Sequence, residues 1–153
     1  MSDSRGNHNG PMPPGGTPPP FEILEHTADI GLRARGRSLE ELFENAAHGL
    51  GEILDVDRPG QAHLAVPVLL GAADIEALLV DWMNEMIVLT EEGRSCLGGV
   101  HVHVVNEEGL QGQVDLVECE PAPEGTELKA ATYHQLSVRQ AEDGWEATVY
   151  FDV

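Results

Sequence analysis

Three acidic groups, far apart in the sequence, could together hold a metal ion. Asp152 precedes Val153, whose α-carboxylate is free if the chain ends as written, and Asp29 lies upstream in a short polar segment. Carboxylate oxygens suit Ca²⁺, Mg²⁺ and Mn²⁺, and a bound cation relieves the repulsion between neighbouring carboxylates. The pattern suggests a divalent-cation site made by Asp29, Asp152 and Val153, with His26 nearby. The alternative is that Asp29 forms a turn while Asp152 faces water at the end of a strand.

Histidines form a second candidate site. His101 and His103 alternate along a predicted strand, so both rings would lie on one face, where His63 from another strand could complete a zinc site. No third ligand has a diagnostic spacing. The alternative is a solvent-facing histidine pair opposite inward-facing valines.

The segment from Lys129 to His134 also carries reactive side chains. Lys129 is the only lysine of the chain, and strand alternation places it on one face with Ala131 and Tyr133. Lysine, tyrosine and histidine side chains can transfer protons, and lysine can contact phosphate. The alternative is a half-buried strand with ordinary polar tips.

Two amphipathic helices are predicted to position these residues. Apolar side chains recur at helical spacing over 39–54, behind a capping box in which Ser38 caps the helix and Glu41 reaches back. A second helix is predicted to start near Asp74 and to end near 91–93.

A like-charged pair, Asp81 and Glu85, lies one turn apart on the second helix. It would form either a solvated helix edge or a landing site for a basic partner.

The other segments alternate as strands do. We expect strands at 21–24, 31–35, 62–70, 100–105, 110–117, 128–140 and 146–153. Helices between groups of strands, followed by hairpins, indicate an α+β fold: a two-layer sandwich with two amphipathic helices packed on a largely antiparallel or mixed β-sheet.

Composition limits the classes of function. The 153 residues suggest one domain, 21–153, behind a disordered Pro/Gly-rich tail, 1–20. A net charge of −19 disfavours direct nucleic-acid binding, and it is compatible with a basic protein partner, a cation or solubility alone. No signal peptide or membrane-spanning segment is apparent. Cys96 and Cys119 are expected as free thiols in a reducing cytoplasm.

No motif in the chain demands an enzyme. There is no Gly-rich phosphate loop after a strand and no G-x-S-x-G nucleophile motif. Five segments in order nevertheless resemble the archease family: 25–31 (EHTADIG), 38–47 (SLEELFENAA), 78–85 (LLVDWMNE), 128–134 (LKAATYH) and 151–153 (FDV). Together they span the chain from about residue 21 to its end, leaving out the tail, the histidine pair and the cysteines.

The resemblance implies a function that the patterns alone do not reach. Archeases are accessory proteins of tRNA splicing and RNA repair that assist a GTP-dependent RNA ligase, which joins 3′-phosphate ends to 5′-hydroxyl ends. They promote guanylylation of the ligase and multiple turnover. Their divalent-cation site, seen with calcium, corresponds by motif position to Asp29, Asp152 and Val153. A lysine implicated in activation corresponds to Lys129.

Two rival functions remain open at this point. An acidic, chaperone-like scaffold would bind basic proteins through charge alone. A free-standing metal-dependent hydrolase would use the same carboxylates, with His26 or His134 as base.

The resemblance favours the activator role over both rivals. We expect a cytoplasmic activator of an RNA ligase, with Mg²⁺ or Mn²⁺ as alternatives to Ca²⁺ and no direct contact with nucleic acid or membrane.

Overall fold

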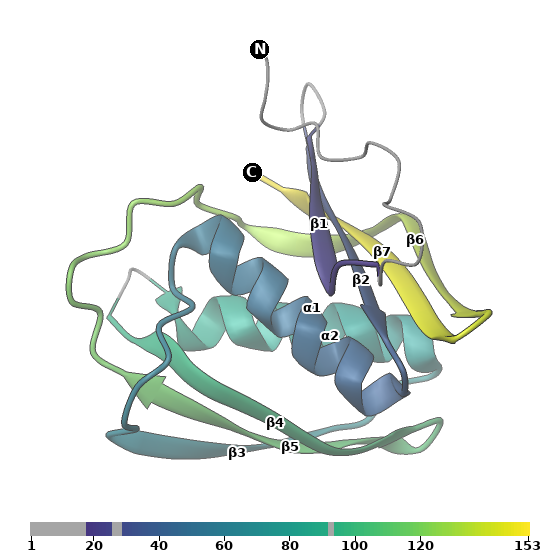
Figure 1. The fold of residues 1–153 in the computed structure, drawn as a ribbon, viewed down its shortest axis with the longest axis horizontal. Helices are drawn as coiled ribbons and strands as arrows, with labels where there is room; N and C mark the ends of the chain where they lie inside the picture. The colour runs from purple at the N-terminus through teal and green to yellow at the C-terminus, as the bar shows by residue number, and fades with distance from the viewer. Residues whose placement is uncertain (1–17, 26–28, 92–93) are drawn as a thin grey trace.

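Seven strands and two helices make up the fold. The computed structural model describes residues 18–25, 29–91 and 94–153. Figure 1 shows the elements, which follow the chain in this order: β1 (Phe21–Glu25), β2 (Ile30–Gly36), α1 (Leu39–Leu54), β3 (Leu64–Leu70), α2 (Ile75–Leu89), β4 (Cys96–Asn106), β5 (Gly109–Val117), β6 (Ala130–Ala141) and β7 (Gly144–Asp152).

The strands form two antiparallel sheets. Sheet A has the order β1-β2-β7-β6, and sheet B has the order β3-β5-β4. Sheet A therefore pairs the first strands of the chain with the last, since β2 lies directly against β7. This pairing brings the two ends of the domain together.

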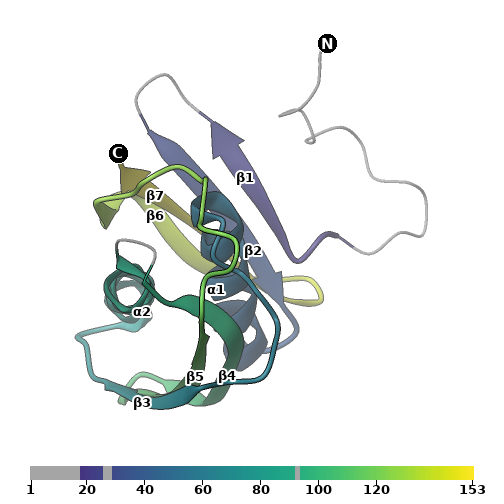
Figure 2. The same ribbon diagram turned by 90° about the vertical axis from the view of Figure 1, so that its left-hand side faces the viewer.

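Both helices lie between the two sheets (Figures 1 and 2). α1 contacts β2 of sheet A and β4 of sheet B, whereas α2 lies against β6 and β3. Trp82 on α2 is fully buried, and its indole N–H donates to the carbonyl oxygen of Phe43 on α1 at 2.9 Å. The core is thus continuous from one sheet through the helices to the other.

The predicted helix starts are confirmed. Ser38 Oγ accepts from the backbone N–H of Glu41 at 3.1 Å, and the Glu41 carboxylate accepts from the backbone N–H of Arg37 at 2.6 Å. Asp74 caps α2 by accepting from Ala77 N at 2.7 Å. These bonds satisfy amide groups that have no partner within the helix.

Helix side chains cover two of the sheet edges. Glu44 and Glu40 of α1 accept from the β4 backbone N–H groups of Val102 and Val105, at 2.8 and 3.0 Å. Asn84 of α2 accepts from Ala131 N of β6 at 2.8 Å. Unpaired edge amides invite pairing with another chain, so these bonds protect the edges of β4 and β6.

The expectation of two free thiols is wrong. Cys96, at the start of β4, forms a disulfide with Cys119, just after β5, and their Cα atoms lie 5.3 Å apart. The antiparallel pairing of Cys96 with Val117 brings the two cysteines within reach. Strand pairing therefore joins two residues that show no motif in the sequence.

The predicted α+β fold, with two helices on antiparallel strands, is confirmed. The strands divide into two sheets, a division that the sequence did not reveal, and the helices are covered on both sides. Neither helix in the described part of the chain is long and apolar enough to cross a membrane. Of the predicted tail, residues 1–17 lie outside the described residues, while Pro20 O accepts from Arg35 N of β2 at 2.9 Å.

Candidate functional site

The ends of β2 and β7 bring two acidic residues together. The antiparallel register pairs Ile30 with Phe151 and ends there, so Asp29 and Asp152 each lie one residue beyond the last pair. Directly opposed residues in such a ladder have Cβ atoms about 4.5–5.5 Å apart. Asp29 is half-buried and Asp152 is exposed. The two carboxylates therefore share one end of sheet A.

Lys129 and Val153 lie at the same end. The backbone N–H of Lys129 donates to the carbonyl oxygen of Asp152 at 2.9 Å, and Ala130 pairs with Asp152 across β6 and β7. The Lys129 side chain is exposed, and Val153 is half exposed. We call Asp29, Lys129, Asp152 and Val153 the terminal cluster. Figure 1 shows the C-terminus close to the ends of β1 and β2.

Close packing holds the start of β2 in place beside this cluster. A Cβ atom on Gly31 would lie 2.6 Å from the ring of Tyr150, so only glycine lets that ring lie across the strand. Tyr150 is buried and pairs with Thr132 of β6. Among the other predicted residues of this region, His26 lies outside the described part of the chain.

The chemistry available to the terminal cluster is that of hard oxygen ligands. Asp29 and Asp152 supply two carboxylates, and the Val153 carboxylate would be a third. Calcium takes several oxygen ligands in flexible geometry, and magnesium needs one or two carboxylates besides water. Among residues 18–25, 29–91 and 94–153, no group of three or more His, Cys, Asp or Glu side chains is placed to hold a metal ion, so a site here would need the Val153 carboxylate beside the two aspartates.

The predicted zinc site is therefore not formed. His101 and His103 are both exposed on β4, but His63 does not join them in a metal-binding group. His101 Nε2 instead lies 3.1 Å from Asp115 Oδ2 of β5. His101 and Asp115 take part in a surface hydrogen-bond network on the outer face of sheet B.

The carboxyl group of Asp115 is the centre of that network. Gln113 Nε2 donates to its other oxygen at 2.9 Å. The bonds from Gln113 and His101 lower the pKa of Asp115 below its ordinary value. These neighbours therefore favour the ionised form of the group.

The strand from Lys129 to His134 departs from simple alternation. β6 pairs Thr132 with Tyr150 and next pairs Ser137 with Thr148, so residues 133–136 form a bulge opposite a single residue of β7. Ala131 is buried, whereas Tyr133 is 62 % exposed. The expectation that Ala131 and Tyr133 share a face is wrong, because the bulge turns the tyrosine outward.

The predicted like-charged pair lies on α2, where Asp81 is exposed and Glu85 is half-buried.

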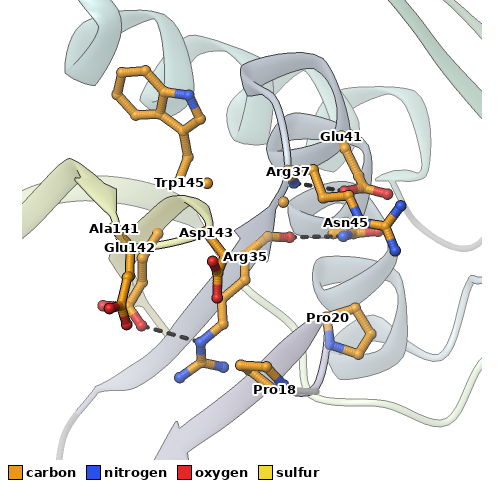
Figure 3. Close-up of a pocket in the computed structure, with 13 residues that line it drawn as sticks. Pro18, Pro20, Arg35, Arg37, Glu41, Asn45, Ala141, Glu142, Asp143 and Trp145 are labelled. Atoms are coloured by element: carbon orange, nitrogen blue, oxygen red, sulfur yellow. Dashed lines mark hydrogen bonds and ion pairs between the residues drawn. The ribbon is translucent and has the colours of Figure 1, made fainter. Parts of the chain in front are cut away.

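A groove of about 650 Å³, which was not predicted from the sequence, lies at the opposite end of sheet A (Figure 3). Arg35 crosses it from β2, with Nη1 at 2.7 Å from Glu22 Oε2 and Nε at 3.1 Å from Glu146 Oε2. Trp145 and the prolines Pro18 and Pro20 form parts of its wall. The arginine is neutralised by carboxylates on both neighbouring strands, so the groove offers no free cationic site at Arg35.

A histidine on α1 makes stability depend on pH. His48 Nδ1 lies 3.0 Å from Asp57 Oδ1, and this hydrogen bond raises the pKa of His48. Burial opposes the rise, while the charges of Asp57 and Glu44 add to it. Because the folded pKa lies above the unfolded one, the stabilisation is fully present below about pH 6.5 and is lost as pH rises through the folded pKa.

We therefore expect the stability advantage of the wild type over His48→Gln to be larger at pH 5.5 than at pH 8.5. Urea denaturation followed by circular dichroism at both pH values measures it. His63→Gln, at an exposed position, is the control and should show no such difference. An advantage of His48 that is equal at both pH values would contradict the assignment.

Comparison with known proteins identifies relatives of the whole folded region. Residues 21–153 match the archease protein family (MTH1598/TM1083). Archeases of Methanosarcina acetivorans and Methanosarcina barkeri are 36% and 34% identical over 139 residues, which cover 87% of this chain and 95% of each relative.

Two solved structures are similar to this one. The solution structure of protein 1598 of Methanobacterium thermoautotrophicum has a TM-score of 0.68 and 30% identity, covering 88% of this chain and 99% of its own. The crystal structure of a Thermotoga maritima archease, described as a possible chaperone, has a TM-score of 0.60 and 26% identity, covering 85% and 94%. These matches extend through both sheets.

Proposed function

Because this chain belongs to the archease family, we propose that it is an accessory protein that activates a GTP-dependent RNA ligase in tRNA splicing and RNA repair. It would promote guanylylation of the ligase and multiple turnover in the cytoplasm, without catalysing the joining itself. The observation that carries the proposal is the β2–β7 register, which sets Asp29 beside Asp152 at the end of the chain.

The terminal cluster has the chemistry that such a role requires. Guanylylation is attack on the α-phosphate of GTP with loss of pyrophosphate, and divalent cations neutralise and orient the phosphates in such displacements. Asp29, Asp152 and the Val153 carboxylate would hold Ca²⁺, Mg²⁺ or Mn²⁺. The exposed Lys129 side chain would contact a phosphate or a carboxylate of the ligase.

The charge of the chain fits a protein partner of opposite sign. A net charge of −19 steers the chain towards a basic RNA-binding enzyme and keeps it off the RNA itself. Steering of this kind weakens as salt is added.

The test is a multiple-turnover ligation assay with the ligase from the same organism, GTP and RNA with 3′-phosphate and 5′-hydroxyl ends. We expect the wild-type chain to raise both the guanylylated fraction of ligase and the number of turnovers. Asp152→Asn and Lys129→Ala should lose at least about tenfold in stimulation, which is about 1.4 kcal/mol. Asp143→Asn, a matched loss of one exposed charge at the turn between β6 and β7, should stimulate fully. If both cluster variants stimulate as well as Asp143→Asn, the proposed site is wrong.

A second candidate function has one observation of its own. The Thermotoga relative is described as a possible chaperone, and an acidic scaffold could bind basic proteins through charge alone. Binding by such a scaffold would collapse in moderate salt and would ignore Asp29→Asn. The same variants therefore separate the two functions.

A further inference from the structure

One aromatic side chain stands apart from the other six. Tyr133 is 62 % exposed, while every other Phe, Trp and Tyr of the chain is buried or half-buried. All seven lie in the described residues, so the contrast holds for the whole chain. Tyrosine is among the residues that dominate binding energy at protein interfaces.

The exposure of Tyr133 results from the bulge in β6. In a regular strand the residue would lie on the same face as buried Ala131, two positions earlier. Residues 133–136 instead leave the ladder, and Gln135 adopts a left-handed backbone with φ of 55°. Such a conformation is unfavourable for a non-glycine residue. The fold therefore holds an unfavourable backbone at the point where it displays its only exposed aromatic ring.

The bulge is fixed to the sheet on both sides. Thr132 Oγ1 donates to Tyr150 O at 3.2 Å and accepts from His134 N at 3.3 Å. The His134 ring meets the Tyr150 ring edge-on, with centroids 6.5 Å apart. Leu136 then returns to the core. A side chain presented from a fixed backbone loses less entropy on binding, which favours affinity.

Protection of the strand edge does not account for the tyrosine. Asn84 already accepts from the N–H of Ala131 at the start of β6. A bulge bearing any polar residue would block edge pairing equally well. The aromatic ring thus needs a separate explanation.

Tyr133 lies near the terminal cluster along β6. Ala130 pairs with Asp152, and Tyr133 follows three residues later, about 10 Å along the strand at about 3.3 Å per residue. A partner that reaches the cluster would meet this ring near Asp29 and Asp152. Cationic side chains favour both the carboxylates and the face of an aromatic ring.

We propose that Tyr133, presented by the 133–136 bulge, is the anchor that docks this chain on its basic partner protein, entering an apolar pocket rimmed by arginine or lysine. This inference rests on the proposed function, because it takes the RNA ligase as the partner. Tyr133 supplies affinity, whereas the terminal cluster supplies activation. The two roles have different kinetic signatures.

The test measures ligase stimulation against the concentration of the added chain. Tyr133→Ala should raise the half-maximal concentration about 30-fold, about 2 kcal/mol, and leave the plateau unchanged. Asp29→Asn should lower the plateau. Tyr133→Phe, which keeps the ring, should stay within about threefold of wild type. Leu69→Ala, at a residue 77 % exposed on sheet B, is the control and should change neither quantity.

Direct binding to the immobilised ligase completes the experiment. Tyr133→Ala should dissociate faster, and its ratio to wild type should hold between 0.05 and about 0.5 M salt, because burial of a ring is not screened as charge is. If the wild type stimulates and Tyr133→Ala matches it in half-maximal concentration and binding, the anchor is wrong and the proposed function stands. If the wild type neither binds nor stimulates the ligase, both fail.

Discussion

Replacement of Asp29 by asparagine is expected to weaken Ca²⁺ binding at least about 100-fold. Loss of a mere supporting partner of a metal ligand costs about 10–100-fold in affinity, so loss of a ligand itself should cost no less. Asp29 and Asp152 follow the last pair of one antiparallel ladder, so the proposed site needs both carboxylates to hold one ion. Isothermal titration calorimetry with Ca²⁺, Mg²⁺ and Mn²⁺ in turn measures the affinities.

Thermal stability gives a second readout that does not need the ligase. A cation at about 100 times its dissociation constant should stabilise the wild type by about 2.7 kcal/mol, and this gain should vanish in Asp29→Asn. Asp143→Asn removes the same charge at the turn between β6 and β7, the other end of the ladder from Asp152, and should keep the gain. A wild type indifferent to all three cations, or an Asp29→Asn variant that binds them like Asp143→Asn, would refute the cation site.

Local sequence patterns predicted the elements of the fold well. The apolar stripe of α1 and its capping box reflect interactions within a few residues, so the sequence displays them directly. The division into two sheets was not visible. It depends on β2 choosing β7 and β3 choosing β5, and alternation specifies a strand without specifying its neighbour.

The candidate site could be predicted only in part, because it too depends on which strands pair. The acidic residues near the two ends of the domain were identified from their types, but only the β2–β7 register sets Asp29 beside Asp152. The bulge after Thr132 was missed, because the alternating pattern continues through Tyr133 and nothing local marks the three extra residues. The disulfide was missed for a related reason, since Cys96 and Cys119 meet only through the pairing of β4 with β5.

Truncation of Trp82 to alanine should be the most destabilising single change in the core. Its side chain is fully buried between the sheets and donates a hydrogen bond to Phe43 O, so it joins the two helices. Truncations of this kind cost about 3–5 kcal/mol, out of a total stability of about 5–15 kcal/mol. The loss comes from buried apolar area and from a cavity that sheets on both sides cannot close. Urea denaturation followed by circular dichroism measures it, and the slope should be unchanged.

Trp82→Phe separates the contributions to this loss, and Trp145→Ala is the control. Trp82→Phe keeps much of the apolar volume but removes the indole donor, and it should cost less than Trp82→Ala by at least about 1 kcal/mol. Trp145→Ala truncates the half-buried tryptophan beside the groove and should cost only about 1 kcal/mol, near the centre of the range for single substitutions. If Trp82→Ala were no more destabilising than Trp145→Ala, the helices could not be the shared layer through which the two sheets are held together.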